Sequence, residues 1–348
     1  VLTDSNVGGA GSWICYLASA SRHKHTVIIP QGAAIKPRLE KTGAKVYELL
    51  GIADRSFSPL AIGRLARLMR SIAPDAVHTH ASVSARIAAR RAHIPCIMTR
   101  HCSDMPPKWH ALMPKKRLSR TVCAAIATDE KARLALLKSG IRDEKITVVR
   151  NGANPLREVS ADERAALQKS LGIPDGAFVA GIFARLEAVK DHATVIEAAR
   201  LCEGEDVYFL IVGTGSLEDA LKKNAPRFVR FCGFTDDIAP YMSLCRANIN
   251  ASRGTETSNL AVIEGMSAGV VPVVSDYGSN PALAKDCGLV FEAGNPAALR
   301  DALLRLKNDQ ALAAKLSAAA KDAFLREYSA ERFAGEIDEV YENALRFQ

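Results

Sequence analysis

Two glutamates flank the junction between a polar loop and a predicted helix in the segment from Asn250 to Gly278. Glu256 lies in the loop, and Glu264 lies eight residues later, two turns into a helix that the apolar spacing predicts over 260–268. The free N–H groups and the positive dipole end of a helix N-terminus suit a phosphate. Carboxylates on either side of that phosphate can accept hydrogen bonds from hydroxyl groups, Glu264 from a ribose and Glu256 from a second sugar. The arrangement therefore predicts a pocket for a sugar nucleotide.

The alternative is a solvated helix with two ordinary surface glutamates, since this spacing is common by chance. The surroundings of Glu264 favour the pocket. Its neighbours Ile263 and Met266 are apolar, and the valine-rich run 270–274 that follows is typical of a strand buried on both faces.

The segment ETSNLAVIEGMSAGVVPVVSD resembles the E-x7-E motif region of retaining GT-B glycosyltransferases, specifically glycosyltransferase family 4. The resemblance implies that Ser258, Asn259 and Leu260, at the predicted helix start, belong to the donor site. Thr257, Ser258 and Asn259 stand where the family pattern has Gly, Phe and a small residue. Those positions line the sugar pocket, so the departure concerns the donor sugar and not the nucleotide.

Two cations follow the buried strand predicted over 178–183. Arg185 and Lys190 lie five residues apart around a strand-to-helix turn, in a segment similar to the family's G-R-L-x-x-x-K-G, with Ala184 and Asp191 in place of its glycines. Both side chains can reach one diphosphate and neutralise a departing nucleotide. They then take the role of a divalent metal, so we expect no metal and no other cofactor. The alternative is a pair of ordinary surface cations.

Three further segments contribute candidate donor contacts. Gly8 and Gly9 belong to a glycine-rich loop that opens a helix expected from Ser12, where N–H groups can approach a phosphate, although a purely structural turn is the alternative. Gly213 ends the strand predicted over 207–212 in the same way. The segment 229–238 is similar to the family's V-x-F-x-G-x-x-x-D, which places Phe234 and Thr235 against a nucleobase.

Histidines occur at the ends of two predicted strands, where open α/β sheets present ligand contacts. His78 and His80 end one strand; they have the spacing of a metal pair, but no third ligand is evident in the sequence. We expect the two side chains to diverge, so that only His80 faces a cleft, near the acceptor. His101 follows the strand predicted over 95–99 and matches the family histidine beside the donor sugar. A neutral imidazole there can bond a sugar hydroxyl, and a packing histidine is the alternative.

The first half of the chain is strongly basic. Residues 1–152 hold 25 Lys and Arg against 10 Asp and Glu, whereas the remainder holds 21 against 28. This asymmetry favours an anionic partner such as a membrane surface. An aromatic among basic residues in 105–120 suits an acceptor mouth or an interfacial anchor, with a solvated basic loop as the alternative; these residues are Lys108, Trp109, Lys115, Lys116 and Arg117.

The length of 348 residues suits two domains, and strands alternate with helices in both halves. We predict an α/β, GT-B chain of two doubly wound, Rossmann-like domains that face an interdomain cleft. The expected boundaries are 1–154 for an acceptor-binding domain, 155–330 for a nucleotide-sugar domain, and 331–348 for a final helix that crosses back to the first domain.

Scattered cysteines without a C-x-x-C pair indicate a reducing cytosol. No run of eighteen apolar residues and no signal peptide is recognisable, and the start at Val1 instead of Met suggests that leading residues are missing. We expect a cytoplasmic protein, peripheral on the inner face of the cell membrane.

The resemblance implies a hexosyltransferase of polysaccharide biosynthesis. Its donor would be a nucleotide-sugar, with UDP as the expected nucleotide, and its acceptor a glycan or a lipid-linked sugar. A sugar-nucleotide epimerase of the same fold is one alternative. A dinucleotide oxidoreductase is disfavoured by the missing fingerprint. A basic nucleic-acid-binding protein is suggested by charge alone, and we expect no nucleic acid partner because no aromatics interleave with the charges on a strand face.

Overall fold

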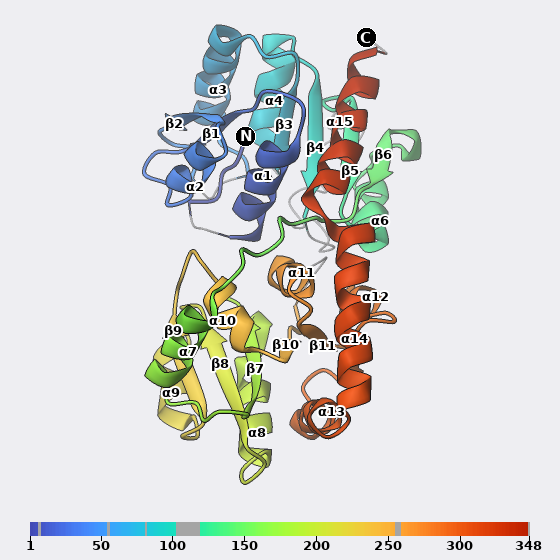
Figure 1. Cartoon of the computed structure of the whole chain (residues 1–348). Coiled ribbons are helices and arrows are strands. Elements are labelled where there is room, and N and C mark those ends of the chain that lie inside the picture. Colours follow the sequence, from blue (N-terminus) through green and yellow to red (C-terminus); the bar gives the residue numbers. More distant parts are fainter. Residues whose placement is uncertain (6–7, 54–55, 81, 102–118, 255–258, 347–348) are drawn as a thin grey trace. The chain divides into compact units, whose positions relative to one another are not determined.

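A computed structural model of the chain describes all residues except 6–7, 54–55, 81, 102–118, 255–258 and 347–348 (Figure 1). The chain divides into two compact units. Unit 1 comprises Val1–Ala153 and Ser329–Gln348, and unit 2 comprises Asn154–Tyr328. Each unit contains parallel strands covered by helices, as the alternation of strands and helices predicts.

Unit 1 is built on two sets of parallel strands. One set pairs β1 with β2, and the other has the order β3-β4-β5-β6. Extended residues at the chain start lie between the two sets, because Leu2 N–H donates to Ile28 O (3.0 Å) and His80 N–H donates to Val1 O (3.2 Å). The strands are β1 (Thr26–Pro30), β2 (Lys45–Leu49), β3 (Val77–His80), β4 (Cys96–Arg100), β5 (Ala124–Ala127) and β6 (Ile146–Val148).

The helices of unit 1 begin at local capping signals. Ser58 and Ser82 accept hydrogen bonds from the backbone N–H groups of Ala61 and Ala85, which starts α3 and α4. The helices are α1 (Gly9–Ala20), α2 (Lys36–Lys41), α3 (Pro59–Ile72), α4 (Val83–Ala92), α6 (Glu130–Lys138) and α15 (Ala330–Arg346), with a 3₁₀ turn at Asp143–Lys145.

The start of α1 differs from the prediction. The helix begins at Gly9 and not at Ser12, so most of the expected glycine loop is its first turn. Gly8 is the extended N-cap residue. Gly11 is buried, and a Cβ atom there would lie 3.0 Å from the side chain of Ile35, so close packing explains this glycine.

Unit 2 contains one six-stranded parallel sheet with the order β12-β11-β10-β7-β8-β9. The chain order reverses between β7 and β10, and this switch point is where open α/β sheets bind ligands, beyond the carboxyl ends of the strands. The strands are β7 (Phe178–Phe183), β8 (Val207–Val212), β9 (Val229–Gly233), β10 (Ala247–Asn250), β11 (Val271–Ser275) and β12 (Leu289–Phe291).

Helices cover both faces of the unit 2 sheet (Figure 1). Strand β10 was not predicted, because two asparagines interrupt its short apolar pattern. The helices are α7 (Ala161–Ser170), α8 (His192–Leu201), α9 (Glu218–Asn224), α10 (Ala239–Leu244), α11 (Leu260–Ser267), α12 (Asn280–Leu283), α13 (Pro296–Asn308) and α14 (Gln310–Ala323), with a 3₁₀ turn at Ala188–Lys190. Nowhere in the described ranges is a helix both long and apolar enough to span a bilayer.

The chain returns to unit 1 through a π-helical turn at Phe324–Tyr328. Ser329 then forms a parallel bridge with Ala153. Helix α15 packs against α1 through a stripe of buried side chains, Phe333, Ile337, Val340 and Tyr341. Its buried Asp338 accepts hydrogen bonds from Ser21 Oγ (2.6 Å) and Arg22 N (3.0 Å), which fixes the helix at the end of α1.

Two glycines near this junction give opposite stability predictions. A Cβ at Gly152 would lie 2.5 Å from Ser329 O and overlap the Phe333 side chain, whereas one at Gly335 in α15 would meet nothing within 4 Å. We expect Gly152→Ala to lower the free energy of unfolding by about 1–3 kcal/mol through overpacking. Gly335→Ala should raise it by about 0.5–1 kcal/mol through helix propensity. Urea denaturation of both variants checks this, and equal effects would contradict it.

Candidate functional site

The cationic turn after β7 lies at the switch point of the unit 2 sheet. Arg185 is exposed, and Lys190 ends the 3₁₀ turn with a half-buried side chain. Burial, followed by the charge of Arg185, lowers the pKa of Lys190 to about 8. An ammonium group with a lowered pKa is less well solvated than a free one, so a nearby anion stabilises it strongly. The turn is therefore suited to a diphosphate.

Backbone packing against the loop after β8 holds this turn in place. Leu186 N–H donates to Thr214 O (3.0 Å), and Leu217 N–H donates to Leu186 O (3.0 Å). A Cβ at Gly215 would lie 2.5 Å from Leu186 O, and one at Gly213 would overlap the carbonyl oxygen of Ala184. The structure thus explains Gly213 by its contact with the cationic turn, and direct contact of Gly213 with a donor stays a prediction.

Helix α11 confirms the predicted helix over 260–268. It begins at Leu260, and the side-chain oxygen of Asn259 accepts a hydrogen bond from Ala261 N–H at 3.0 Å. Asn259 is therefore the N-cap residue and occupies one of the N–H groups expected to be free. Glu264 lies on this helix with a half-buried side chain. Glu256 and Ser258 lie outside the described residues.

Phe234 and Thr235 follow β9 and differ in what their side chains offer. Phe234 is 55% exposed, which leaves its ring available for stacking on a base. The Thr235 hydroxyl is engaged within its own turn, since it donates to Asp237 O (3.0 Å) and accepts from Asp237 N–H (3.1 Å). Any base contact from Thr235 must therefore come from its backbone.

In unit 1, the expectation that His78 and His80 diverge is wrong. Their ring centroids lie 4.6 Å apart on one face of β3, because residues two apart on a strand point the same way. Both rings make T-shaped contacts with the Trp13 ring, with ring centroids 5.6 Å apart for His78 and 5.0 Å apart for His80. Trp13 was not singled out in the sequence, because an aromatic residue in a short apolar helix pattern cannot be distinguished from an ordinary core residue.

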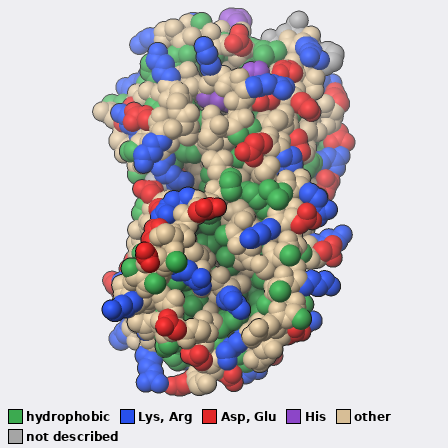
Figure 2. Space-filling view, in the orientation of Figure 1, with side chains coloured by type: hydrophobic (Ala, Val, Ile, Leu, Met, Phe, Trp, Pro, Cys, Tyr) green, Lys and Arg blue, Asp and Glu red, His purple; other side chains and the backbone are tan. Residues whose placement is uncertain are grey.

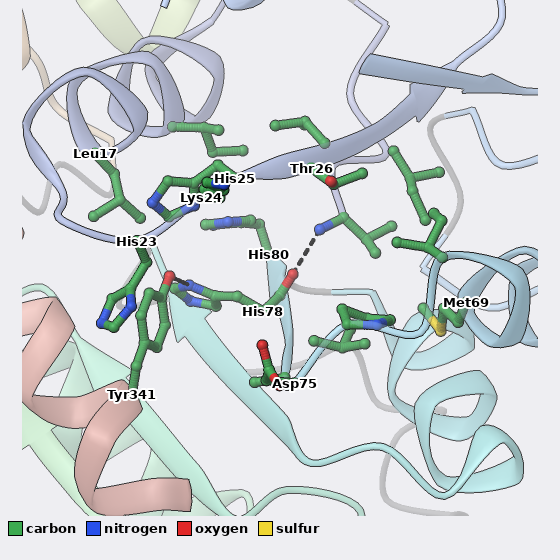
Figure 3. A pocket seen from close by; sticks show the side chains of 18 of the residues that line it. Leu17, His23, Lys24, His25, Thr26, Met69, Asp75, His78, His80 and Tyr341 are labelled. Atoms are coloured by element: carbon green, nitrogen blue, oxygen red, sulfur yellow. Dashed lines mark hydrogen bonds between the residues drawn. The ribbon is translucent and has the colours of Figure 1, made fainter. Parts of the chain in front are cut away.

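The histidines form a hydrogen-bonded cluster. His80 Nδ1 lies 2.8 Å from His101 Nε2, so one proton lies between the two rings and their tautomers are coupled. His78 bonds Tyr341 Oη and Thr99 Oγ1, both at 2.7 Å, and Figure 3 shows the Tyr341 and His78 side chains pointing toward each other. His80 is only 6% exposed, so most of its ring packs inside unit 1 next to His101; contact of His80 with an acceptor stays a prediction.

All three imidazoles of the cluster are neutral at pH 7. Burial lowers the pKa of His101 to about 4 and holds the pKa values of His78 and His80 well below their usual range. A neutral His101 is the state predicted for a residue that bonds a sugar hydroxyl. Trp13 Nε1–H also donates to Asn151 Oδ1 (3.1 Å), which joins this cluster to the segment that follows β6.

A cavity of about 310 Å³ lies beside this cluster (Figure 3). Its lining includes Thr26 and Val77, the first residues of β1 and β3. It therefore reaches the amino ends of the strands, whereas ligands of open α/β sheets bind beyond the carboxyl ends. We do not assign it to the candidate site.

The other predicted site residues either make only local contacts or lie outside the described residues. Gly8 O accepts a hydrogen bond from Ser12 N–H (3.1 Å) at the start of α1, and Gly9 is the first helical residue. The basic and aromatic candidates Lys108, Trp109, Lys115, Lys116 and Arg117 lie outside the described residues. Across the ranges that the structure describes, no group of three or more His, Cys, Asp or Glu is placed to hold a metal ion.

Two family models match the chain. The model for Glycosyltransferase Family 4 matches residues 7–157, and the model for Glycosyl transferases group 1 matches residues 177–309. The chain is 27% identical over 275 residues to the UDP-Gal:alpha-D-GlcNAc-diphosphoundecaprenol alpha-1,3-galactosyltransferase of Escherichia coli, covering 71% of this chain and 70% of that protein.

Solved structures with the same fold align over nearly the whole chain. Anabaena Alr3699/HepE in complex with UDP and glucose covers 97% of this chain and 96% of its own, with 21% identity and a TM-score of 0.83. A glycosyltransferase from Rickettsia africae covers 99% and 98%, with 19% identity and a TM-score of 0.84. These likenesses establish the GT-B fold predicted from the sequence.

The histidine cluster predicts acid sensitivity of unit 1. Folding disfavours protonation of His78, His80 and His101, so their contribution to stability is complete above the ordinary histidine pKa of 6.5 and falls as the pH drops toward 4. For His101, whose pKa is lowered to about 4, the cost is about 1.4 kcal/mol per pH unit between 6.5 and that value. Thermal unfolding between pH 7.5 and 5 should show a steep loss, and His101→Asn should reduce the slope. The exposed His93 is the control, and a His93→Asn variant with the same reduction would contradict the assignment.

Proposed function

This chain belongs to glycosyltransferase family 4, and we propose that it transfers a hexose from a UDP-sugar, with retention at the anomeric carbon, to a glycan or lipid-linked acceptor. The observation that carries the proposal is the cationic turn of Arg185 and Lys190 at the switch point of the unit 2 sheet. In this proposal unit 2 binds the nucleotide-sugar and unit 1 binds the acceptor.

The turn supplies the electrostatic part of the mechanism. When the bond from the anomeric carbon to the diphosphate breaks, negative charge develops on the departing UDP. Arg185 and Lys190 neutralise that charge, and the half-buried Lys190 contributes most because a less solvated cation attracts an anion more strongly. These two cations take the place of a divalent metal, so we propose transfer without a metal cofactor.

The other predicted residues bind and orient the substrates. Glu264 on α11 binds the ribose, and Phe234 covers the nucleobase with its exposed ring. Glu256 and the neutral His101 orient the donor sugar. We assign these groups to positioning and charge stabilisation, since no carboxylate nucleophile is evident among them.

Two relatives support the choice of substrates. The E. coli relative is named for a UDP-galactose donor and a diphosphoundecaprenol-linked GlcNAc acceptor. The Anabaena protein of the same fold was crystallised with UDP and glucose. A UDP-sugar donor and a lipid-linked acceptor are therefore the first substrates to test for this chain.

We propose that unit 1 also carries a membrane-facing surface, which would accord with such an acceptor. Leu50 and Leu60 are 63% and 78% exposed, and Phe57 lies between them in the chain with 39% exposure. Arg64 Nη1 donates to Leu50 O (2.8 Å), which places a cation beside these apolar side chains. On the face of the chain that Figure 2 shows, basic and acidic side chains are interspersed. Exposed leucines beside arginine suit the interface of an anionic bilayer.

The donor proposal predicts selective stabilisation by uridine nucleotides. UDP, UDP-glucose, UDP-galactose and UDP-GlcNAc should raise the melting temperature, whereas GDP-mannose and ADP-glucose should do so less. Lys190→Ala should weaken UDP binding about 10–100-fold through loss of a charge-assisted contact. The exposed Lys223→Ala in α9 is the matched control and should bind UDP normally. Absence of stabilisation by every nucleotide-sugar would refute the proposal.

The membrane proposal predicts binding that depends on lipid charge. The protein should co-sediment with vesicles that contain about 30% anionic lipid and much less with neutral vesicles. Each basic residue near the anionic surface should contribute about 1 kcal/mol of binding free energy. Leu60→Asp should weaken this binding without changing UDP affinity. Equal and negligible binding to both kinds of vesicle would rule the membrane surface out.

A further inference from the structure

Two loops meet at the switch point of the unit 2 sheet. The loop after β7 carries Lys190 and Asp191, and the loop after β10 carries Arg253. The two strands are hydrogen-bonded neighbours, so their loops leave the same edge of the sheet side by side. A fixed distance between these loops is needed if both contribute to one ligand site.

An ion pair joins the two loops. Arg253 Nε donates to Asp191 Oδ2 at 2.6 Å. The Asp191 side chain is only 9% exposed, whereas the Arg253 side chain is 53% exposed, so the carboxylate is the buried partner. Removal of its cation would leave an uncompensated charge in the turn, which is much more costly than loss of an exposed ion pair.

The backbone of Asp191 indicates that its side chain is needed. Asp191 has φ 51° and ψ 47°, the left-handed conformation that favours glycine and is next most readily adopted by Asn and Asp. Its carboxylate also caps α8, since Thr194 N–H donates to Asp191 Oδ1 at 3.4 Å, and Thr194 Oγ1 donates to Asp191 Oδ2 at 2.6 Å. The cap lies within the chain segment that follows β7, whereas the bond to Arg253 connects Asp191 to the loop after β10.

Further contacts hold the same two loops together. Arg253 N–H donates to Val189 O at 2.9 Å. A Cβ at Gly254 would lie 2.8 Å from Val189 Cβ, and one at Gly294 would lie 2.5 Å from Arg253 Cζ. Glycines at 254 and 294 thus make room for Val189 and for the guanidinium group. A backbone hydrogen bond, close packing at glycines and an ion pair therefore hold the two loops together.

We propose that Asp191 and Arg253 form a clamp that positions the Lys190 ammonium group for the donor diphosphate, so that both are positioning residues for sugar transfer. This inference rests on the proposed function of the cationic turn. Asp191 directly follows Lys190 in the chain, so any movement of the clamp moves the Lys190 backbone. Release of the clamp opens the turn to water and misplaces the cation.

Four variants test the clamp. Asp191→Asn keeps the left-handed backbone and the helix cap, and Arg253→Met keeps the side-chain length, while each removes the charge pair. UDP should bind each about tenfold more weakly, and the double variant no more weakly than either single one, because both changes break one interaction. Thr194→Val removes only the hydroxyl bond to Asp191 and should bind UDP like the unaltered protein.

A second readout does not depend on UDP. In protein with ¹³C-methylated lysines, the NMR signal of Lys190, assigned through Lys190→Arg, should titrate near pH 8, where burial places its pKa. In the Asp191→Asn and Arg253→Met variants this pKa should rise toward the ordinary lysine value of 10.5, because water enters the turn. In Thr194→Val it should stay near 8.

The two readouts separate the clamp from the proposed function. Unchanged UDP affinity and an unchanged Lys190 titration in both clamp variants would overturn the clamp. If the unaltered protein binds no UDP while the Lys190 titration still moves in the variants, the clamp stands and the donor site proposed for the turn is wrong.

Discussion

A half-buried ammonium group at the carboxyl edge of a parallel sheet is the constraint on which unit 2 depends. Full hydration would stabilise the charged Lys190 side chain best, but burial and the nearby charge of Arg185 lower its pKa to about 8. Such a cation is stabilised by an anion far more than a surface lysine is. The close backbone contacts of Gly213 and Gly215 with the turn explain how the fold keeps it in this position.

In unit 1, ionisable groups also lie near the carboxyl ends of parallel strands. There the ionisable groups are imidazoles kept neutral by burial, and they are ordered by hydrogen bonds to one another, to Thr99 and to Tyr341. The last of these partners comes from α15, so the end of the chain completes the surroundings of residues more than two hundred positions earlier.

Much of the fold followed from local patterns. The apolar runs predicted β7 and β8 at their observed bounds. Predictions were weaker where tertiary contacts override the local pattern. Strand β10 is polar at Asn248 and Asn250 yet buried, because Asn248 Nδ2 donates to Ala261 O and Asn250 Nδ2 donates to Asn280 Oδ1. Such partners lie too far along the chain for spacing to reveal them.

By itself, the sequence determined the class of chemistry and the candidate residues for it: the strand-turn-helix around Arg185 and Lys190, the helix that carries Glu264, and His101 at a strand end. Only the tertiary structure decided what supports them. It placed His80 beside His101, 21 positions away, and Trp13 against three imidazoles that lie 65 or more positions away. It also paired Arg253 with Asp191, 62 positions away. The reason is physical: a catalytic group is recognisable from its type and its local element, whereas the group that fixes its position is chosen by proximity in the folded chain, which residue spacing does not encode.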